Sequence, residues 1–253
     1  MVSPDRNQIN RELLVAALGD EWPADLIQTA AEMLADSTSR FPSGPRRLPG
    51  DLVRAIQRER LLVGMLRAVS ELGYRLTNVQ DVIERAGVSR PTFYEHFSNK
   101  DDCFLAAFDT SAARLRNQIA IAAKEGGDSW RDRLRGCFDA LLTFAATEPE
   151  AARIVIVEAR AATPDAALRR VALLDHFATC IDDTVRTMLP TDIAHSAVTA
   201  SGVVGGVESL LYARINRGQI DDLPALLPSL MYFAVLPYEG HLAASEELGL
   251  KST

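Results

Sequence analysis

Two short helical patterns joined by a glycine turn occupy residues 77–100, with the sequence TNVQDVIERAGVSRPTFYEHFSNK. Thr77 and Gln80, three residues apart, form the capping-box pattern that opens a helix, and Gly87 is the residue at which that helix ends. Ser89 then caps a second helix, whose first turn tolerates a proline that donates no hydrogen bond. Two helices with a turn of about three residues between them predict a helix-turn-helix. The competing interpretation is an ordinary corner between two helices.

The second helix of this pair has one apolar side and one polar side. Phe93 and Phe97, four residues apart, share a face that anchors the helix to a core. A helix that only packed into a core would not need the donors that surround these two rings. A helix in the major groove contacts base edges with its first residues, while its flanks bind phosphates. We therefore predict DNA contacts by Thr77, Arg90, Thr92, Tyr94, His96 and Lys100.

Each side chain of this polar side has an expected role. Arg90 donates to a guanine or holds a phosphate, and Thr92 contacts a thymine methyl group or a phosphate. Tyr94 and His96 lie on the side away from the phenylalanines and donate to phosphate oxygens. Lys100 adds a cation at the start of the next helix, where free backbone N–H groups also attract phosphate.

The distribution of charge favours DNA binding by this part of the chain only. The net charge of the whole chain is −7, which as a bulk property argues against nucleic acid. Residues 46–100, however, hold ten Lys or Arg against six Asp or Glu, whereas the remainder holds 17 basic and 28 acidic residues. Phosphate binding requires a local basic surface rather than a basic protein. The acidic remainder would discourage the rest of the molecule from lying on DNA.

Residues 54–109 resemble the DNA-binding domain of the TetR family of transcriptional repressors. The resemblance rests on ERLLVGMLRAVSELGY, on T-x-x-x-x-V-I-x-R-A-G-V-S and chiefly on A-G-V-S followed by T-F-Y-x-H-F-x-x-K. It implies a homodimer, a palindromic operator and an all-helical C-terminal ligand domain. Pro91 stands where the family often has Gly, which removes one backbone donor to phosphate. By matched position, the resemblance implies DNA contact from Arg90, Thr92, Tyr94, His96 and Lys100.

About 50 residues precede this region, more than most members of the family have. We expect two short amphipathic helices there, at 9–19 and 23–36, which dock on the protein because they are acidic and have an apolar face. Residues 37–50 are rich in Pro, Gly, Ser and Arg, and predict a loop or arm. Arg46 and Arg47 of this arm either enter a minor groove or are solvated residues of a linker.

Helical spacing of apolar residues continues through almost all of the remaining chain. Strand-like alternation is scarce, and the best β-branched run, residues 154–157, lies within a helical pattern. We therefore predict an all-α fold in three parts. They are an N-terminal extension over 1–50, a three-helix helix-turn-helix DNA-binding domain over 51–106, and a ligand-binding and dimerisation domain over 107–253. The expected helices are 51–72, 101–124, 129–147, 149–161, 165–188, 192–217, 223–236 and a weaker one at 240–248.

The segment 192–236 is the expected dimer interface. Its Ala, Gly and Ser residues leave one helix face narrow enough for close packing, and its Val, Leu, Met and Phe residues supply apolar area. Two such helices from each chain would pair across a two-fold axis as a four-helix bundle. The TetR family does this with its last two helices, and the sequence here is similar. The alternative is packing within one chain.

The segment 107–188 is expected to hold a ligand cavity if the resemblance extends that far. Polar residues within apolar helical faces are the best indicators of such a site, and aromatic residues of the core are candidates for its wall. A surface ion pair is the competing interpretation for the polar residues. The predicted ligand residues are Arg153, Glu158, Asp175, His176, Phe138 and Phe177.

The sequence shows no pattern typical of an enzyme or a membrane protein. It has four His, three widely spaced Cys and no glycine-rich phosphate loop, so we expect no catalytic site, metal or cofactor. No apolar run reaches the ~18 to 20 residues of a membrane span, and the first residues lack the apolar core of a signal peptide. We therefore expect a cytoplasmic protein with no membrane partner.

The function predicted from these features is a dimeric, ligand-responsive repressor that binds a palindromic operator in double-stranded DNA. Its expected partners are the operator, a second copy of the chain and a small-molecule effector of unknown identity. The alternative is a DNA-binding regulator without small-molecule input, controlled by a protein partner through the N-terminal 36 residues. An enzyme is the rival from another class, and His176 beside Asp175 is its only candidate site.

Overall fold

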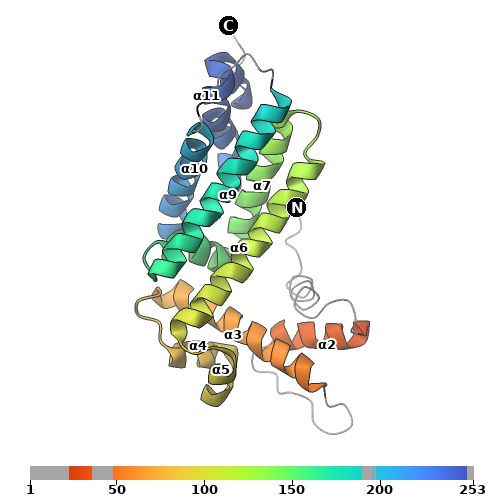
Figure 1. Ribbon diagram of the computed structural model, residues 1–253, viewed down its shortest axis with the longest axis vertical. Helices are drawn as coiled ribbons and strands as arrows, with labels where there is room; N and C mark the ends of the chain where they lie inside the picture. Colours follow the sequence, from red (N-terminus) through yellow and green to blue (C-terminus); the bar gives the residue numbers. More distant parts are fainter. Residues whose placement is uncertain (1–22, 36–47, 190–195, 197, 250–253) are drawn as a thin grey trace. The chain divides into compact units, whose positions relative to one another are not determined.

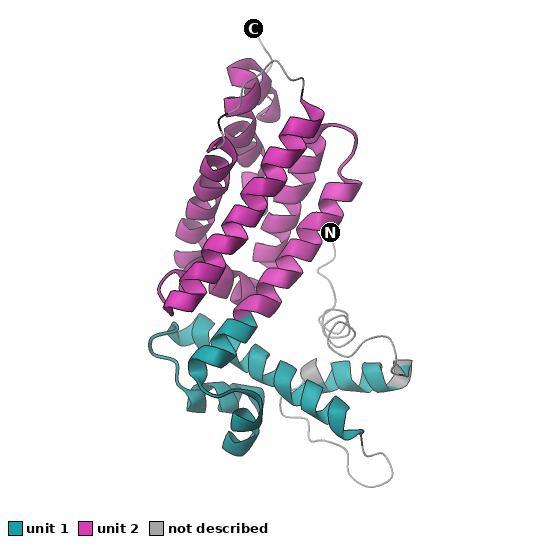
Figure 2. Cartoon of the chain, in the orientation of Figure 1, with its two compact units in different colours: residues 1–107 teal, residues 108–253 magenta. Residues whose placement is uncertain are grey.

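A computed structural model describes residues 23–35, 48–189, 196 and 198–249 of the chain, and it confirms the all-α fold over this part (Figure 1). The helix expected at 9–19 lies outside the described residues, as do Arg46, Arg47 and almost all of the arm expected at 37–50. The chain divides into two compact units, unit 1 over Met1–Ala107 and unit 2 over Phe108–Thr253 (Figure 2).

Unit 1 contains the predicted helix-turn-helix. Its helices are α2 (Ala24–Ala35), α3 (Gly50–Leu72), α4 (Val79–Ala86), α5 (Arg90–His96) and the beginning of α6 (Lys100–Glu125). Gly64 lets α3 and α4 approach closely, because a Cβ atom there would lie 2.7 Å from the carbonyl oxygen of Val82. A larger residue at this position would force the two helices apart. We call α5 the recognition helix.

The cap of α4 differs by one residue from the expectation. The N-cap is Asn78, whose Oδ1 accepts hydrogen bonds from the backbone N–H groups of Gln80 (2.8 Å) and Asp81 (3.2 Å). Asp81 completes the capping box by accepting from the Asn78 N–H at 2.8 Å. Thr77 as the cap was therefore wrong. Its side chain is buried and donates to the Gly73 carbonyl at 2.9 Å, so it cannot also cap α4.

The recognition helix forms as its sequence predicts. Gly87 ends α4 in the left-handed region, at φ 63°, which glycine adopts without a steric penalty. Ser89 caps α5 by accepting from the Thr92 N–H at 3.3 Å. Phe93 and Phe97 are buried, and their ring centroids lie 5.9 Å apart. The two rings fasten one face of α5 to the unit and leave the other face outside.

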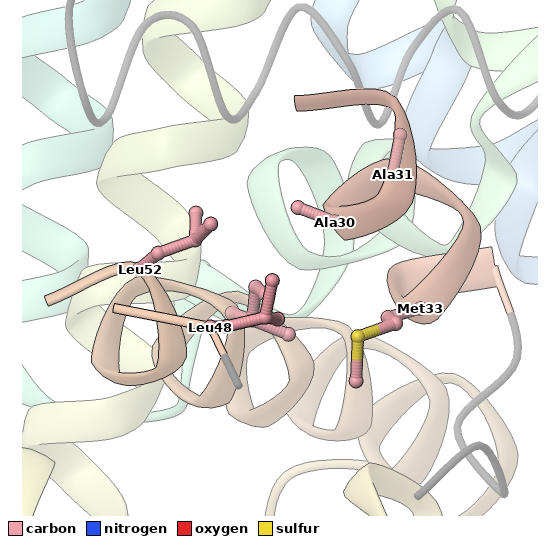
Figure 3. Close-up of a cluster of buried hydrophobic side chains, with 6 residues drawn as sticks. Ala30, Ala31, Met33, Leu48 and Leu52 are labelled. Atoms are coloured by element: carbon pink, nitrogen blue, oxygen red, sulfur yellow. The ribbon is translucent and has the colours of Figure 1, made fainter. Parts of the chain in front are cut away.

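The N-terminal helix α2 packs on the first half of α3 through a small apolar cluster (Figure 3). Its members are Ala30, Ala31, Met33, Leu48, Leu52 and Ile56. The buried guanidinium of Arg60 adds a polar link, since its Nε and Nη2 donate to the Met33 carbonyl at 3.2 and 2.8 Å. An arginine near a helix C-terminus satisfies carbonyls that have no partner within the helix. The helix expected at 23–36 is thus confirmed, and it docks on the protein.

Unit 2 is a bundle of long helices (Figure 1). Its elements after α6 are α7 (Trp130–Thr147), α8 (Pro149–Ala152), η2 (Arg153–Val157), η3 (Glu158–Arg160), α9 (Pro164–Met188), α10 (Thr199–Asn216), η4 (Pro224–Leu226) and α11 (Leu227–Glu247).

One helix of unit 2 differs from the sequence prediction, and a predicted break in another is confirmed. The single helix expected at 149–161 is a succession of α8, a π-helical turn and a 3₁₀ turn. The helices expected separately at 223–236 and 240–248 both form within α11, where the non-helical Gly240 (φ 81°) divides them by a kink. The β-branched run at 154–157 lies in the π-helical turn, and all four of its side chains are buried.

Candidate DNA-binding and effector sites

The outer face of the recognition helix presents polar side chains above a filled apolar interior. Arg90 is exposed, and its Nη2 donates to Gln80 Oε1 at 3.2 Å. Tyr94 is 52% exposed, and its ring is in an edge-to-face contact with that of Phe93, with 5.3 Å between the ring centroids. Thr92 is half-buried and shares a hydrogen bond of 2.8 Å with the Ser89 hydroxyl. These groups are held in place yet remain available on the surface.

His96, at the end of the recognition helix, is half-buried. Burial lowers its pKa from the ordinary value of 6.5, and the positive charges of Arg54 and Arg58 lower it further, while Glu95 opposes them. His96 is therefore neutral at pH 7. Its Nε2 is buried and has no hydrogen-bond partner among the described residues.

Lys100 begins α6 and is tied to the turn between α3 and α4. Its Nζ donates to the carbonyls of Tyr74 (3.1 Å) and Thr77 (3.0 Å) and stands 4.1 Å from the centroid of the Tyr74 ring. An ammonium group has three protons, so one donor remains for a phosphate. Tyr74 itself is buried, and its hydroxyl donates to Asp101.

The structure thus brings together five of the predicted DNA contacts and separates one from them. Arg90, Thr92, Tyr94 and His96 share the recognition helix, and Lys100 follows it directly. Thr77 does not join them, because its side chain is 2% exposed and both its N–H and its hydroxyl are directed at the Gly73 carbonyl. Gln80, which holds the Arg90 guanidinium, was missed as a site residue because its position suggested a cap.

Unit 2 contains a cavity of about 170 Å³ whose wall is largely apolar. Among the predicted ligand residues, Phe138, His176 and Phe177 line it. Asp175 is exposed and does not line the cavity, and neither do Arg153 and Glu158, which form an ion pair of 3.2 Å with each other. Their side chains are 25% and 14% exposed, so this is a partly buried ion pair outside the cavity wall. The thiol of Cys137 also lines the cavity, and burial raises its pKa to about 11, so it is uncharged there at pH 7.

The cavity wall includes a buried charge cluster that sequence reasoning missed. Glu208 of α10 is 7% exposed and accepts from Arg170 of α9 at 3.0 and 2.8 Å. Arg160 also binds Glu208, through Nε at 3.2 Å and a second contact from Nη2, and its guanidinium lies 4.3 Å from the centroid of the Tyr212 ring. Glu208 is the single acidic residue in the sequence of α10, which was the available signal.

A surface of small and apolar residues runs along α10 and α11. Gly202 and Gly205 are exposed, and a Cβ atom built on either would meet nothing within 4 Å. Leu210 (37% exposed), Phe233 (44%) and Leu236 (37%) are large apolar side chains left partly in solvent. We call these five residues the α10–α11 surface.

Two features are absent from the described part of the chain. No group of three or more His, Cys, Asp or Glu there is arranged to hold a metal ion. Among the described helices, none has the length and apolar character needed to cross a membrane.

Comparison with known proteins identifies the region around the recognition helix. Residues 61–107 match the family model for bacterial regulatory proteins of the tetR family. The HTH-type transcriptional activator FasR of Mycolicibacterium smegmatis is 25% identical over 181 residues, which are 71% of this chain and 82% of FasR. The HTH-type transcriptional repressor AcnR of Corynebacterium diphtheriae is 28% identical over 184 residues, 68% of this chain and 88% of AcnR.

Solved structures share the fold as well. The transcriptional regulator FadR of Bacillus subtilis, solved in complex with stearoyl-CoA, superposes with a TM-score of 0.60 at 17% identity. The match covers 71% of this chain and 97% of that one. The sequence match at the recognition helix, the similarity to transcriptional regulators over two-thirds of the chain and the shared all-α architecture agree. These matches identify residues 61–107 as a DNA-binding domain of the tetR family type, in a chain that is similar in sequence and fold to transcriptional regulators.

Proposed function

We propose that this regulator binds a palindromic operator as a homodimer, with one recognition helix of each copy in the major groove. The observation that carries the proposal is the exposed polar face of α5 above the buried rings of Phe93 and Phe97. A short helix fixed by its apolar side and polar on the other has the form that major-groove recognition requires. Such a protein acts where the chromosome lies, so we place it in the cytoplasm.

The proposed contacts divide into base and phosphate contacts. Arg90 reads a base edge, and Thr92 touches a thymine methyl group or a phosphate. Tyr94, His96 and Lys100 bind phosphates and fix the register of the helix on the duplex. Thr77 is left out, because both of its donors are used inside the protein.

We propose a three-part organisation: an extension over 1–50, a DNA-binding domain over 51–106 and a ligand-binding and dimerisation domain over 107–253. Arg46 and Arg47, in the extension, remain candidates for a minor-groove contact. Dimerisation uses the α10–α11 surface, where Gly202 and Gly205 allow a partner helix to approach closely. Burial of Leu210, Phe233 and Leu236 supplies the apolar contact.

The proposed effector is a small apolar or amphipathic molecule that occupies the cavity of unit 2. The stearoyl-CoA complex of FadR supports an effector with an apolar chain. The volume of about 170 Å³ is near that of a dry cavity of about 150 Å³ that holds benzene, so it suits a short apolar body. Phe138, His176 and Phe177 would contact that body, and Arg170 with Glu208 would meet its polar end.

Effector and operator would be coupled through α10, which supplies cavity-lining residues on one side and the proposed dimer surface on the other. An effector changes DNA affinity only if it binds one dimer geometry more tightly than another. A coupling free energy of about 1 to 3 kcal/mol is typical of such linkage. FasR is an activator and AcnR a repressor, and we propose repression as the simpler outcome, in which the effector releases DNA.

A mobility-shift assay with the DNA upstream of the protein's own gene, repeated against a panel of metabolites, tests the proposal. We expect a specific shift that one class of amphipathic metabolite reverses. Failure to shift any fragment of that region more strongly than a scrambled duplex would contradict operator binding. Binding that no metabolite changes would favour control by a protein partner instead.

A further inference from the structure

The first helix of the DNA-binding unit is longer than the region that matches the family model. That match begins at residue 61, whereas α3 begins at Gly50. Arg54 and Arg58 lie in these additional turns, four residues apart and therefore on one face of α3. Neither was among the DNA contacts expected from the recognition helix.

This face of α3 lies against the C-terminal end of the recognition helix. The guanidinium of Arg58 stands 5.6 Å from the centroid of the Phe97 ring, within the range of a cation–π contact, and its side chain is 43% exposed. Arg54 is exposed, and no carboxylate of the described residues lies within ion-pair distance of it. Both positive charges contribute to lowering the pKa of His96 at the end of the recognition helix.

Of these two arginines, only Arg58 has a carboxylate within ion-pair distance among the described residues. Glu59 Oε1 lies 3.4 Å from Arg58 Nη1, but Glu59 is 5% exposed and is directed inward. Glu95 of α5 and Asp51 of α3 are exposed to solvent, and neither lies within 4.0 Å of the Arg54 or Arg58 guanidinium group. A pair of cations at the edge of a DNA-binding helix attracts phosphate.

The additional turns of α3 are braced by α2. Leu52 and Ile56, which alternate with the two arginines along α3, are fully buried in the cluster with Ala30, Ala31 and Met33 (Figure 3). Arg60 closes the C-terminal end of α2 through the Met33 carbonyl. A helix end without such packing frays in water. The packing of α2 therefore holds the backbone of the turns that carry Arg54 and Arg58, which lowers the entropy lost when these turns bind a partner.

We propose that Arg54 and Arg58 form a second phosphate-binding site, which contacts the backbone of double-stranded DNA flanking the major groove entered by the recognition helix. The site reads no bases, so it raises affinity for every duplex equally. In this proposal the role of α2 is to hold the site in position. The inference rests on the DNA binding proposed above and extends the interface beyond the matched family region.

Salt-dependent binding of the full-length chain tests this site. The dissociation constant is measured by fluorescence anisotropy for the upstream duplex and for a scrambled duplex of equal length, over a series of KCl concentrations. The variants are Arg54→Ala, the double variant Arg54→Ala/Arg58→Ala and the control Arg67→Ala. Arg67 carries the same charge on the same helix. It is nine residues from Arg58, and because an α-helix turns by about 100° per residue, it lies on the opposite face.

We expect weaker binding of both duplexes by the arginine variants, with an unchanged ratio between the two. The slope of log K against log salt should fall by about 0.9 for each phosphate contact removed, and Arg67→Ala should match the wild type. Because Arg58 packs on Phe97, the double variant could lose stability. Arg54 is exposed, so the single variant Arg54→Ala should stay folded and still tests the site.

Three outcomes count against one idea or the other. An unchanged salt slope in Arg54→Ala and the double variant overturns the second phosphate site. An equal loss in Arg67→Ala also overturns it, because net charge rather than a contact would then explain the effect. Absence of binding by the wild-type protein to either duplex contradicts the DNA-binding proposal itself.

Discussion

The recognition helix α5 exposes its polar residues to solvent, whereas α10 buries its single carboxylate and exposes small and apolar residues. In α5 the aromatic rings are inside and the charged and hydroxyl groups face solvent. In α10 glycines and Leu210 face solvent, and the single carboxylate, Glu208, is buried against two arginines. The first arrangement leaves donors available for a polar partner such as DNA. The arrangement in α10 leaves an apolar outer surface on which another helix could pack, and it places the Glu208 carboxylate in the wall of the cavity.

The largest effect should come from removing the anchor of the recognition helix. Phe93→Ala should lower the free energy of unfolding by about 3–5 kcal/mol, because Phe93 is fully buried and its loss leaves a cavity. Tyr94→Ala, at a neighbouring position that is 52% exposed, should change it by less than about 1 kcal/mol. Denaturant unfolding followed by circular dichroism measures both. Equal losses would show that α5 has no inner and outer side.

The buried carboxylate of α10 should be the next most costly to remove. Glu208→Ala leaves Arg160 and Arg170 without their shared partner, which should destabilise the protein by about 3 kcal/mol. The ion pair between Arg169 and Asp109 is exposed on both sides, so Asp109→Ala should cost less than about 1 kcal/mol. Thermal melts of the two variants compare them directly, and a reversed order would refute the importance assigned to burial.

Arg90→Ala should affect DNA recognition without affecting folding. Arg90 is exposed, so the melting temperature should match that of the wild type. The operator should bind about 1–3 kcal/mol more weakly, with relaxed preference at one base pair of each half-site. Competition binding against single-base operator variants measures this change. A uniform loss across all sequences would reassign Arg90 to a phosphate.

Gly205→Leu should change only the outward face of α10, and so affect dimerisation but not the folding of each protomer. Because a Cβ atom at this position meets nothing within 4 Å, each protomer should fold as before. A leucine would prevent close approach of a second copy and raise the dimer dissociation constant at least about tenfold, or ~1.4 kcal/mol. Sedimentation analysis over a range of protein concentrations reports the change. A dimer unaffected by this variant would place the interface elsewhere.

The smallest effect concerns the cap that precedes the recognition helix. Asn78→Ala should cost about 1 kcal/mol, since Asn78 accepts two backbone hydrogen bonds at the start of α4. Gln80→Ala should lower the free energy of unfolding by less than this. If Thr77 were the cap instead, Gln80 would be its capping-box partner, and Gln80→Ala would be the more destabilising change. Chemical unfolding of the two variants distinguishes the registers.

Local signals along the chain were strong enough to predict most of unit 1. Ser89, Pro91 and Gly87 determine where α4 ends and α5 begins, because caps and left-handed glycines act within a few residues. The one-residue error at Thr77 arose because Thr77 and Asn78 are both good caps. Asn78 is the cap in the structure because the Thr77 hydroxyl donates a hydrogen bond to the Gly73 carbonyl instead.

The effector site was harder to predict, because its members come from distant parts of the chain. Phe138, His176 and Phe177 line the cavity as expected, but Arg153 and Glu158 turned out to pair with each other. Glu208 is 38 residues from one arginine partner and 48 from the other. No spacing rule connects residues so far apart, since their contact depends on how α9 and α10 pack.

The amino-acid sequence by itself determined the helical character of the chain, the turn at Gly87 and the polar outer face of the recognition helix. These properties follow from interactions within a few residues and from the 3.6-residue period of the helix. Only the tertiary structure decided that Thr77 is buried, that Glu208 lies between two arginines and that α2 braces Arg54 and Arg58. These properties depend on which helices pack against each other. A polar group is desolvated only when segments distant in the sequence cover it, so local sequence patterns do not predict its burial.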